Sequence, residues 1–174
     1  MVKRYARVLS CGTNNLVIAP NEQEVGKLFS GDTRSDIGSE AEKMKVANAV
    51  NGLVVKFIRL DNNEELSSDM LVMERLYPMD YRAFEYSKRE LWLDVFIDEI
   101  KQLHRAGFVH RDLKRPSNIP GDRFDNIFLT NQGIRLIDVG VSALRSQVGD
   151  TLFQRFVDEE HKEIELFSEY FLNR

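Results

Sequence analysis

The sequence predicts an α+β fold, with a small antiparallel sheet and one helix in its first half and a mostly helical second half. Before residue 77, short runs rich in Val, Ile and Leu are separated by turn residues, as is typical of strands. After residue 86, apolar residues recur at helical spacing in two long segments. With 174 residues, 43% of them hydrophobic, the chain is large enough to bury the core of one domain, which we expect to span residues 1–174.

The first half is expected to contain one helix among five strands. The helix is predicted over Ser35–Val50, because Met44, Ala47 and Val50 fall on one helical face. Short links between the strands favour antiparallel pairing. The segments with strand character are Arg4–Leu9, Asn15–Ala19, Glu24–Phe29, Leu53–Leu60 and Met70–Leu76.

The second half is expected to consist of two long helices around a hairpin. The first helix is predicted over Ser87–Ala106 and ends at Gly107, a residue type that readily adopts the left-handed conformation of a helix end. The hairpin pairs Asn126–Thr130 with Gly133–Asp138, and the second helix covers Thr151–Leu172. The apolar residues that support the helices are Leu91, Val95, Phe96, Ile100 and Leu103 in the first, and Phe156, Ile164, Phe167 and Phe171 in the second.

Composition argues against several classes of protein. The net charge of −4 is not that of a dedicated nucleic-acid binder, so no nucleic-acid partner is expected. No apolar run approaches the roughly 18–20 residues of a membrane span, and none follows the start in the manner of a Sec signal peptide. Cys11 is the only cysteine in the sequence, which suits a reducing compartment. We therefore expect a cytoplasmic protein, in its own cell or, if exported as an effector, in a host cell.

Two carboxylates and one amide stand at the ends of apolar, strand-like segments. Asp112 and Asp138 each close such a segment, and Asn126 opens the predicted hairpin. These positions suggest oxygen ligands at the mouth of a cleft. Two carboxylate or amide groups, together with phosphate oxygens, are a usual way for a protein to hold Mg²⁺. The pattern therefore indicates a site for magnesium and phosphate.

Two strings around these acids resemble motifs of the protein-kinase superfamily. His110-Arg111-Asp112-Leu113-Lys114 is similar to the catalytic loop of Ser/Thr kinases, and Asp138-Val139-Gly140 is similar to their metal-binding Asp-Phe-Gly. The resemblance covers roughly residues 5–145. It implies a two-lobed, kinase-like fold that binds ATP and Mg²⁺, with an N-lobe of about residues 1–75, a hinge of about 74–80 and a reduced C-lobe of about 81–174.

The resemblance implies catalytic roles for four residues. Asp112 would accept the proton of the attacking hydroxyl, and Lys114 would steady the transferred phosphoryl group. Lys27 stands where the third-strand lysine belongs and would contact the α- and β-phosphates. Glu42 is the helix carboxylate expected to hold Lys27, and Glu40 is the alternative. An exposed lysine and a solvated helix face are the plainer interpretation of this pair.

The other implied contacts surround the nucleotide. The turn at residues 10–15 falls where the glycine-rich loop belongs, and residues 71–76 resemble the fifth strand and hinge. The apolar side chains expected around the adenine are equally typical of an ordinary core. Only backbone groups are expected to be used at the hinge, so substitution of the hinge side chains should matter little. The implied residues are Ser10, Gly12 and Asn15 at the phosphates, Val17, Val25 and Met73 at the adenine, and Glu74 and Leu76 at the hinge.

Asn126 and Asp138 are the implied metal ligands, although both are also ordinary turn residues. In the family the asparagine usually lies five residues after the catalytic aspartate, where this chain has Ser117. We interpret Arg115–Phe124, which contains two prolines and a glycine, as a loop insertion that moves the ligand to Asn126. Asn118 is the alternative.

The chain ends soon after the second motif. Only 34 residues follow Gly140, with no Ala-Pro-Glu string among them. This truncation is similar to that of small bacterial effector kinases and Rio-type kinases, and it implies activity without activation-loop phosphorylation.

Lys114 resembles the lysine of the Ser/Thr branch of the family, so we expect a Ser/Thr kinase. Its substrate is expected to be a protein that the sequence does not identify, and an activating partner protein is left open. The alternatives are a pseudokinase that binds nucleotide or a partner, and a small-molecule phosphotransferase on a kinase-like fold.

Overall fold

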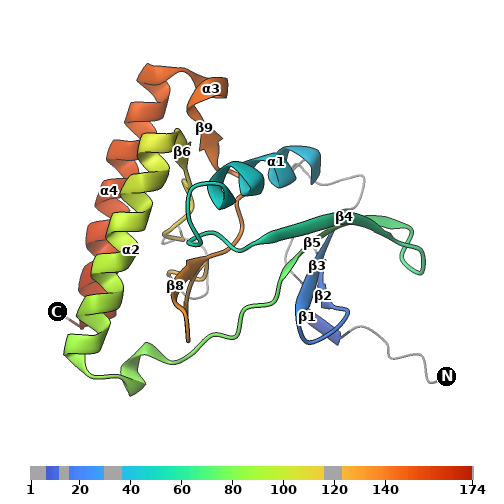
Figure 1. The fold of residues 1–174 in the computed structure, drawn as a ribbon, viewed down its shortest axis with the longest axis horizontal. Helices are drawn as coiled ribbons and strands as arrows, with labels where there is room; N and C mark the ends of the chain where they lie inside the picture. The colour runs from blue at the N-terminus through green and yellow to red at the C-terminus, as the bar shows by residue number, and fades with distance from the viewer. Residues whose placement is uncertain (1–6, 12–15, 30–36, 116–122, 174) are drawn as a thin grey trace.

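The computed structural model has the expected α+β class (Figure 1). It describes residues 7–11, 16–29, 37–115 and 123–173. One antiparallel sheet has the strand order β1-β2-β3-β5-β4, and two short ladders, β6–β9 and β7–β8, lie in the second half of the chain. The strands of the large sheet are β1 (Arg7–Cys11), β2 (Leu16–Ala19), β3 (Glu24–Phe29), β4 (Phe57–Asn63) and β5 (Ser68–Glu74).

The register of the large sheet puts Lys27 on the same face as four apolar residues. Lys27 of β3 pairs with Val17 of β2 on one side and with Leu71 of β5 on the other. Val25 lies two residues before Lys27 and pairs with Met73. Because side chains alternate between the two faces of a strand, these five residues share a face. Leu71 belongs to the main hydrophobic core and Met73 packs against it, so the Lys27 face of the sheet points toward the rest of the molecule.

The opposite face of the sheet has its own apolar cluster, which requires a glycine. Leu28, Met70 and Val72 are buried there. Gly26 lies directly beneath Met70, and a Cβ atom at this position would be 2.2 Å from the Met70 sulfur. The close packing of Met70 on β3 therefore depends on the missing side chain of Gly26.

A single helix, α1 (Ile37–Asn48), follows β3 within the segment predicted to be helical. Its buried face carries Glu40, Ala41, Met44 and Ala47. Glu40 is thus a carboxylate on an otherwise apolar face.

Two long helices that pack against each other form the second half of the chain (Figure 1). They are α2 (Tyr86–Ala106) and α4 (Asp150–Leu172), close to the predicted bounds. Gly107 ends α2 with a φ of 92°, which confirms the expected left-handed helix end. The hairpin β7–β8 is also confirmed. The smaller elements are η1 (Tyr81–Ala83), β6 (Phe108–Val109), β7 (Ile127–Thr130), β8 (Gly133–Leu136), β9 (Ala143–Leu144) and α3 (Arg145–Val148).

The buried face of α2 differs in part from the prediction. Ile100 and Leu103 are buried as expected, but Leu91 is 67% exposed and Val95 is 57% exposed. Leu93 continues the buried stripe instead. The reason is helical phase, because positions 93, 96, 100 and 103 fall on one face and positions 91 and 95 fall on the side of the helix that points away from it.

The segment Leu53–Val55 joins the sheet to the second half of the chain. The prediction of a single strand over Leu53–Leu60 is wrong for this first part, since β4 begins only at Phe57. Val54 instead forms a parallel bridge with Leu136 of β8. Hydrogen bonds of 2.8 Å flank the bridge, from Val55 N to Leu136 O and from Leu136 N to Leu53 O. The apolar run is therefore buried at a junction rather than in the sheet.

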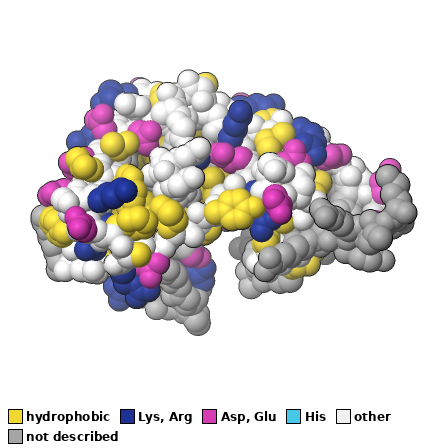
Figure 2. All heavy atoms as spheres, turned by 60° about the horizontal axis from the view of Figure 1, so that its bottom comes forward, with side chains coloured by type: hydrophobic (Ala, Val, Ile, Leu, Met, Phe, Trp, Pro, Cys, Tyr) yellow, Lys and Arg dark blue, Asp and Glu magenta, His cyan; other side chains and the backbone are white. Residues whose placement is uncertain are grey.

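One hydrophobic core extends through both parts of the molecule. It includes Met44 of α1, Leu71 of β5, Phe96 of α2, Leu136 of β8 and Phe167 of α4. The space-filling view shows a hollow between the part built on α2 and α4 and the part built on the sheet (Figure 2). Within the described ranges, no helix is both long enough and apolar enough to cross a membrane.

Candidate active site

Lys27 of β3 lies at the centre of the candidate site. Its Nζ atom is 2.9 Å from Oε1 of Glu40 on α1 and 3.4 Å from Oδ1 of Asp138, which follows β8. Lys27 is only 7% exposed, so its amine is held inside the molecule. Three segments that are far apart in the sequence therefore meet at one amine.

The acid that holds Lys27 is Glu40, and the prediction of Glu42 for this role is wrong. Glu40 is 2% exposed and contacts Lys27 through both carboxylate oxygens, whereas Glu42 is exposed. Helical phase explains the difference. Glu40 lies four residues before Met44 on the buried face of α1, and Glu42 lies on the other side of the helix.

The charges of Lys27 and Asp138 favour each other, whereas burial raises the pKa of Glu40 above its usual value despite the contact with Lys27. Burial lowers the pKa of Lys27, but the carboxylates of Asp138 and Glu40 outweigh it and leave this pKa above its usual value. Partial burial raises the pKa of Asp138, yet Lys27 and the backbone N–H of Gly140 more than offset it and leave this pKa below its usual value. At neutral pH the site thus presents a cationic amine beside an anionic carboxylate.

The β7–β8 hairpin brings Asn126 and Asp138 to neighbouring positions. The N–H of Ile137 donates to the carbonyl oxygen of Asn126 at 3.0 Å, so Asn126 lies opposite the residue that precedes Asp138. Asp138 itself has a φ of 57°, and its Oδ1 accepts a hydrogen bond from Gly140 N at 3.2 Å. The chain therefore turns sharply at the carboxylate as it leaves the hairpin.

Asp112 is tied to Asn126 by two hydrogen bonds. Nδ2 of Asn126 donates to the backbone oxygen of Asp112 at 2.9 Å and to its Oδ2 at 3.1 Å. Burial raises the pKa of Asp112 above its usual value; Asp138 adds to this effect, while His110 and the bond from Asn126 oppose it. A carboxylate that is partly exposed and has a raised pKa is suited to accept a proton.

His110 fixes the backbone of the segment that carries Asp112. Its Nε2 donates to the carbonyl oxygen of Ile137 at 2.9 Å, and its Nδ1 accepts from Asp112 N at 3.2 Å. The Ser142 hydroxyl donates to the His110 carbonyl at 2.9 Å. Both ring nitrogens are therefore used in holding the loop against the end of β8.

The guanidinium of Arg111 contacts only uncharged groups among the described residues, and no carboxylate binds it there. The guanidinium lies 3.8 Å from the centroid of the Phe156 ring on α4, and Nη1 donates to the carbonyl oxygen of Val141 at 3.2 Å. The residue has a φ of 71°, a conformation uncommon for a residue other than glycine. Its side chain is thus occupied by an aromatic ring and a backbone oxygen.

Glu160 of α4 holds the backbone of Arg111 in its left-handed conformation, a role that was not predicted from the sequence. Its Oε1 accepts from Arg111 N at 2.8 Å, and its Oε2 lies 2.6 Å from Nε2 of His104. Glu160 is only 2% exposed. One signal was available, because Glu160 interrupts the apolar stripe of α4 four residues before Ile164.

Glu163, one turn further along α4, holds the next part of the loop. Its Oε2 accepts from Leu113 N at 3.1 Å and from Lys114 N at 3.2 Å. The backbone of Lys114 is thereby fixed next to Asp112. The sequence gives no signal for Glu163, because acidic residues are common on helix faces exposed to water.

Glu163 leads to a prediction about the pH dependence of stability. Burial and the neighbouring Glu160 raise the pKa of Glu163 above its usual value of 4.5. A carboxyl whose pKa is raised on folding contributes stability that is full below the unfolded pKa and is lost as pH rises through the folded pKa. We expect Glu163→Gln, which keeps an acceptor oxygen, to remove this contribution. From pH 4.5 upward its free energy of unfolding should fall less with pH than that of the wild type, as measured by urea unfolding.

The control for this experiment is Glu165→Gln. Glu165 lies on the same helix but is exposed, so this variant should keep the pH profile of the wild type. Parallel profiles for Glu163→Gln and the wild type would contradict the account of Glu163.

The three side chains predicted to surround the adenine lie on the Lys27 face of the sheet. Val25 is buried, and Val17 and Met73 are partly buried. The register described above places Val17 opposite Lys27 and Met73 opposite Val25. Their shared face agrees with the predicted arrangement, and their contact with a nucleotide stays a prediction.

The phosphate-loop prediction falls largely outside the described residues. Gly12 and Asn15 lie outside them, as does Asn118, the alternative metal ligand. Ser10 belongs to β1 and pairs with Val17. The roles of these residues stay predictions, as does the role of most of the Arg115–Phe124 insertion.

The side chain of Glu74 has a structural role that revises the expectation for the hinge. Its Oε1 accepts from Lys56 N at 2.9 Å and forms an ion pair with Nη2 of Arg135 on β8. Arg135 is 7% exposed, so it relies on this partner. Substitution of Glu74 is therefore expected to affect stability. Leu76 is partly buried and packs against the main core.

Asp138 and Asn126 are the residues of this site that could hold a magnesium ion together with phosphate. Asp138 offers a carboxylate that is 46% exposed, and Asn126 offers an amide oxygen, its nitrogen being bonded to Asp112. In the part of the chain that the structure describes, no group of three or more His, Cys, Asp and Glu side chains could hold a metal ion. The ion would take its other ligands from phosphate and water, as Mg²⁺ usually does.

Comparisons with known proteins do not identify a family for this chain. No protein-family model matches it, and no curated protein matches it significantly. Functional inference therefore depends on the residues of the site.

Proposed function

We propose that this chain is a minimal protein kinase that uses ATP and Mg²⁺ to phosphorylate Ser or Thr residues of a protein substrate. The observation that carries the proposal is the meeting of Lys27, Glu40 and Asp138 at one point, together with the linked pair Asp112 and Asn126. The order of elements, with α1 between the third and fourth strands of the sheet and the hairpin after α2, supports the resemblance to a two-lobed kinase fold.

The proposed reaction is a displacement at the γ-phosphorus of ATP. The substrate hydroxyl oxygen forms a bond to this phosphorus, while the bond from the phosphorus to the oxygen bridging it to the β-phosphate breaks, and ADP leaves with that electron pair. The hydroxyl proton passes to the carboxylate of Asp112, whose raised pKa suits an acceptor. Lys114 is placed two residues further along the same loop to steady the transferred group.

The other residues would position the nucleotide. Lys27, fixed by Glu40, would contact the α- and β-phosphates, and such positioning is the main contribution of a protein to phosphoryl transfer. Asp138 and Asn126 would hold Mg²⁺, which when bound neutralises charge on the phosphate oxygens.

The contacts of Arg111 support activity without phosphorylation of an activation loop. A phosphorylated residue would need a free guanidinium to bind. Here the guanidinium stacks on Phe156 and donates to Val141 O. We therefore propose that the site is assembled in the unmodified chain. The single cysteine and the use of ATP suit a reducing compartment inside a cell.

Transfer of labelled phosphate tests the proposal. Purified protein with Mg²⁺ and γ-labelled ATP is expected to label itself or proteins of a cell lysate. Asp138→Ala should reduce this labelling by about 1,000-fold or more, since it removes both a metal ligand and a partner of Lys27. Asp158→Ala, which removes an exposed aspartate of α4, is the matched control and should label normally.

The other outcomes separate the alternatives. Equal labelling by Asp138→Ala and the wild type would contradict the proposal. A rise in melting temperature with Mg²⁺ and ATP, without transfer to any acceptor, would indicate a nucleotide-binding module. Consumption of ATP only in the presence of sugars, lipids or antibiotics would indicate a small-molecule phosphotransferase.

A further inference from the structure

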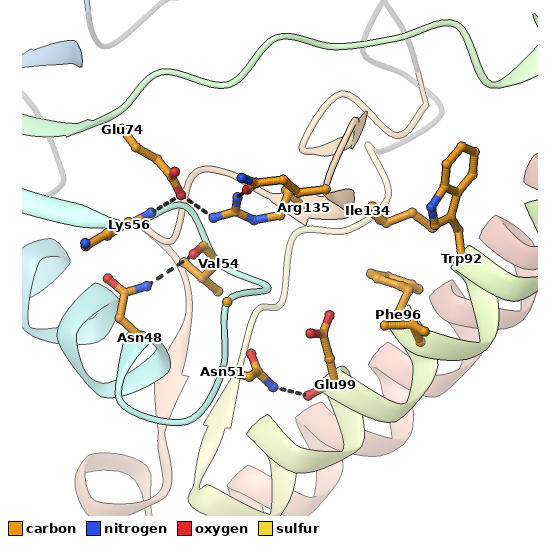
Figure 3. A pocket seen from close by; sticks show the side chains of 14 residues that line it. Asn48, Asn51, Val54, Lys56, Glu74, Trp92, Phe96, Glu99, Ile134 and Arg135 are labelled. Carbon is orange, nitrogen blue, oxygen red and sulfur yellow. Dashed lines mark hydrogen bonds and ion pairs between the residues drawn. The ribbon is translucent and has the colours of Figure 1, made fainter. Parts of the chain in front are cut away.

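A cavity of about 560 Å³ lies outside the candidate active site, between α2, β8 and the link from α1 to β4 (Figure 3). Its lining includes neither Lys27 nor the acids that surround it. The volume is within the range of pockets that hold ligands.

The cavity has an apolar wall and a carboxylate. Trp92 and Phe96 of α2 and Ile134 of β8 form the apolar wall, and Glu99 of α2 projects into the space beside them (Figure 3). Among the described residues, none donates a hydrogen bond to the Glu99 carboxylate. Burial raises its pKa, although Arg135 opposes this effect. A cation bound next to Glu99 would stabilise the ionised form of this carboxylate.

Arg135 is not the cation that pairs with Glu99, because its guanidinium already forms an ion pair with another residue. Its Nη2 forms the ion pair with Glu74, and its Nη1 donates to Gln132 at 3.2 Å. Its Nε has no hydrogen-bond partner in the described part of the chain. Figure 3 shows the guanidinium at the cavity wall, with the Lys56 side chain pointing away from Glu99. The wall therefore combines a free carboxylate with a buried donor that lacks an acceptor.

An apolar stripe of α2 begins outside the cavity at Leu91 and enters its lining at Val95, and an acidic stripe runs beside it. Leu91 and Val95, which are 67% and 57% exposed, lead at four-residue spacing to Glu99. A parallel exposed stripe consists of Glu90, Asp94 and Asp98. The apolar surface therefore extends beyond what a small ligand in the cavity would cover. Its border is negatively charged beside Leu91 and Val95, and the acidic stripe ends where Lys101 and Arg105 follow it.

We propose that the cavity, together with Leu91 and Val95, is a docking surface for a basic, apolar peptide segment of a partner protein. One Lys or Arg side chain of the segment enters the cavity beside Glu99, whose carboxylate attracts a cation. Trp92 contributes apolar surface only, because Nζ of Lys88 already lies 5.1 Å from the centroid of its ring. Apolar residues of the segment cover Leu91 and Val95. Its other basic residues face the acidic stripe, which selects a basic partner over an acidic one.

Fluorescence anisotropy with a defined probe tests this surface. The probe is a labelled 18-residue peptide with Leu and Lys at helical spacing, and the comparison peptide has Glu in place of Lys. The Lys peptide is expected to bind the wild type and the Glu peptide is not. Binding should weaken about tenfold in Glu99→Gln, and similarly in the double variant Leu91→Ser/Val95→Ser. The assay contains no nucleotide, so its result is independent of the proposed phosphoryl transfer.

Glu165→Gln is the matched control, because it removes the same charge from an exposed position on α4. It should bind the Lys peptide like the wild type, and circular dichroism should show all variants folded. Equal binding by Glu99→Gln and Glu165→Gln would mean attraction to overall charge and would overturn the proposal. It would also be overturned by absence of binding at about 1 mM peptide, a concentration that still detects weak complexes. A dimer in analytical ultracentrifugation that the double variant abolishes would assign the surface to a second copy instead.

Discussion

Glu40→Ala is expected to reduce phosphoryl transfer by about 100-fold or more, because it releases the amine that positions the nucleotide. It should also lower the free energy of unfolding by about 3 kcal/mol, since it leaves Lys27 buried with Asp138 as its remaining acidic partner. Rates of labelled phosphate transfer and urea unfolding measure the two effects. Because Glu40 acts through Lys27, the KM for ATP should rise, and adding Lys27→Ala to Glu40→Ala should cost little more.

Glu42→Ala is the matched control for this prediction. It removes the same side chain two residues away, from the exposed side of α1. Its transfer rate should equal that of the wild type, and its stability should change by less than about 0.5 kcal/mol. If the two variants lost activity equally, the pairing of Lys27 with Glu40 would not have the role given to it.

Glu160→Ala is expected to lower both stability and activity. The change leaves the N–H of Arg111 and the buried ring of His104 without their acceptor. Unsatisfied buried groups of this kind, together with the cavity left behind, should cost about 3 kcal/mol. The same N–H fixes the left-handed backbone next to Asp112, so the rate of transfer should fall by about 100-fold in the molecules that remain folded.

Glu159→Ala is the matched control for Glu160→Ala. Glu159 is the preceding residue of α4, is exposed and forms an ion pair with Arg155 across one helical turn, at 3.4 Å. Surface pairs of this kind contribute little, so its stability should change by less than about 0.5 kcal/mol. Rates must be compared at a temperature where each variant is folded. A Glu160→Ala variant with wild-type stability and rate would contradict the described role of α4.

Much of the fold could be predicted because its elements carry local signals. Gly107 marks the end of α2, and the apolar spacing of α4 sets its bounds within one residue. The junction Leu53–Val55 could not be predicted in this way. Its apolar run has the same local pattern whether it pairs within the sheet or with Leu136 of β8, and only the tertiary arrangement decides between them.

The candidate site was predictable where a motif or helical phase gave information. Asp112 and Asp138 came from motifs. The prediction of Glu42 was wrong, but the helical phase set by Met44 and Ala47 would have favoured Glu40. By contrast, Glu163 has no sequence signal, because its role depends on backbone N–H groups from a segment 49 and 50 residues earlier. Side chains that bind backbone groups of another segment are set by the fold as a whole.

The most direct test of the central claim is a crystal structure of the chain with Mg²⁺ and a non-hydrolysable ATP analogue. The account predicts the triphosphate beside Lys27, with the amine still held by Glu40, and the ion bound by Asp138 and Asn126. Nucleotide bound away from Lys27, or Mg²⁺ bound by other residues, would contradict it.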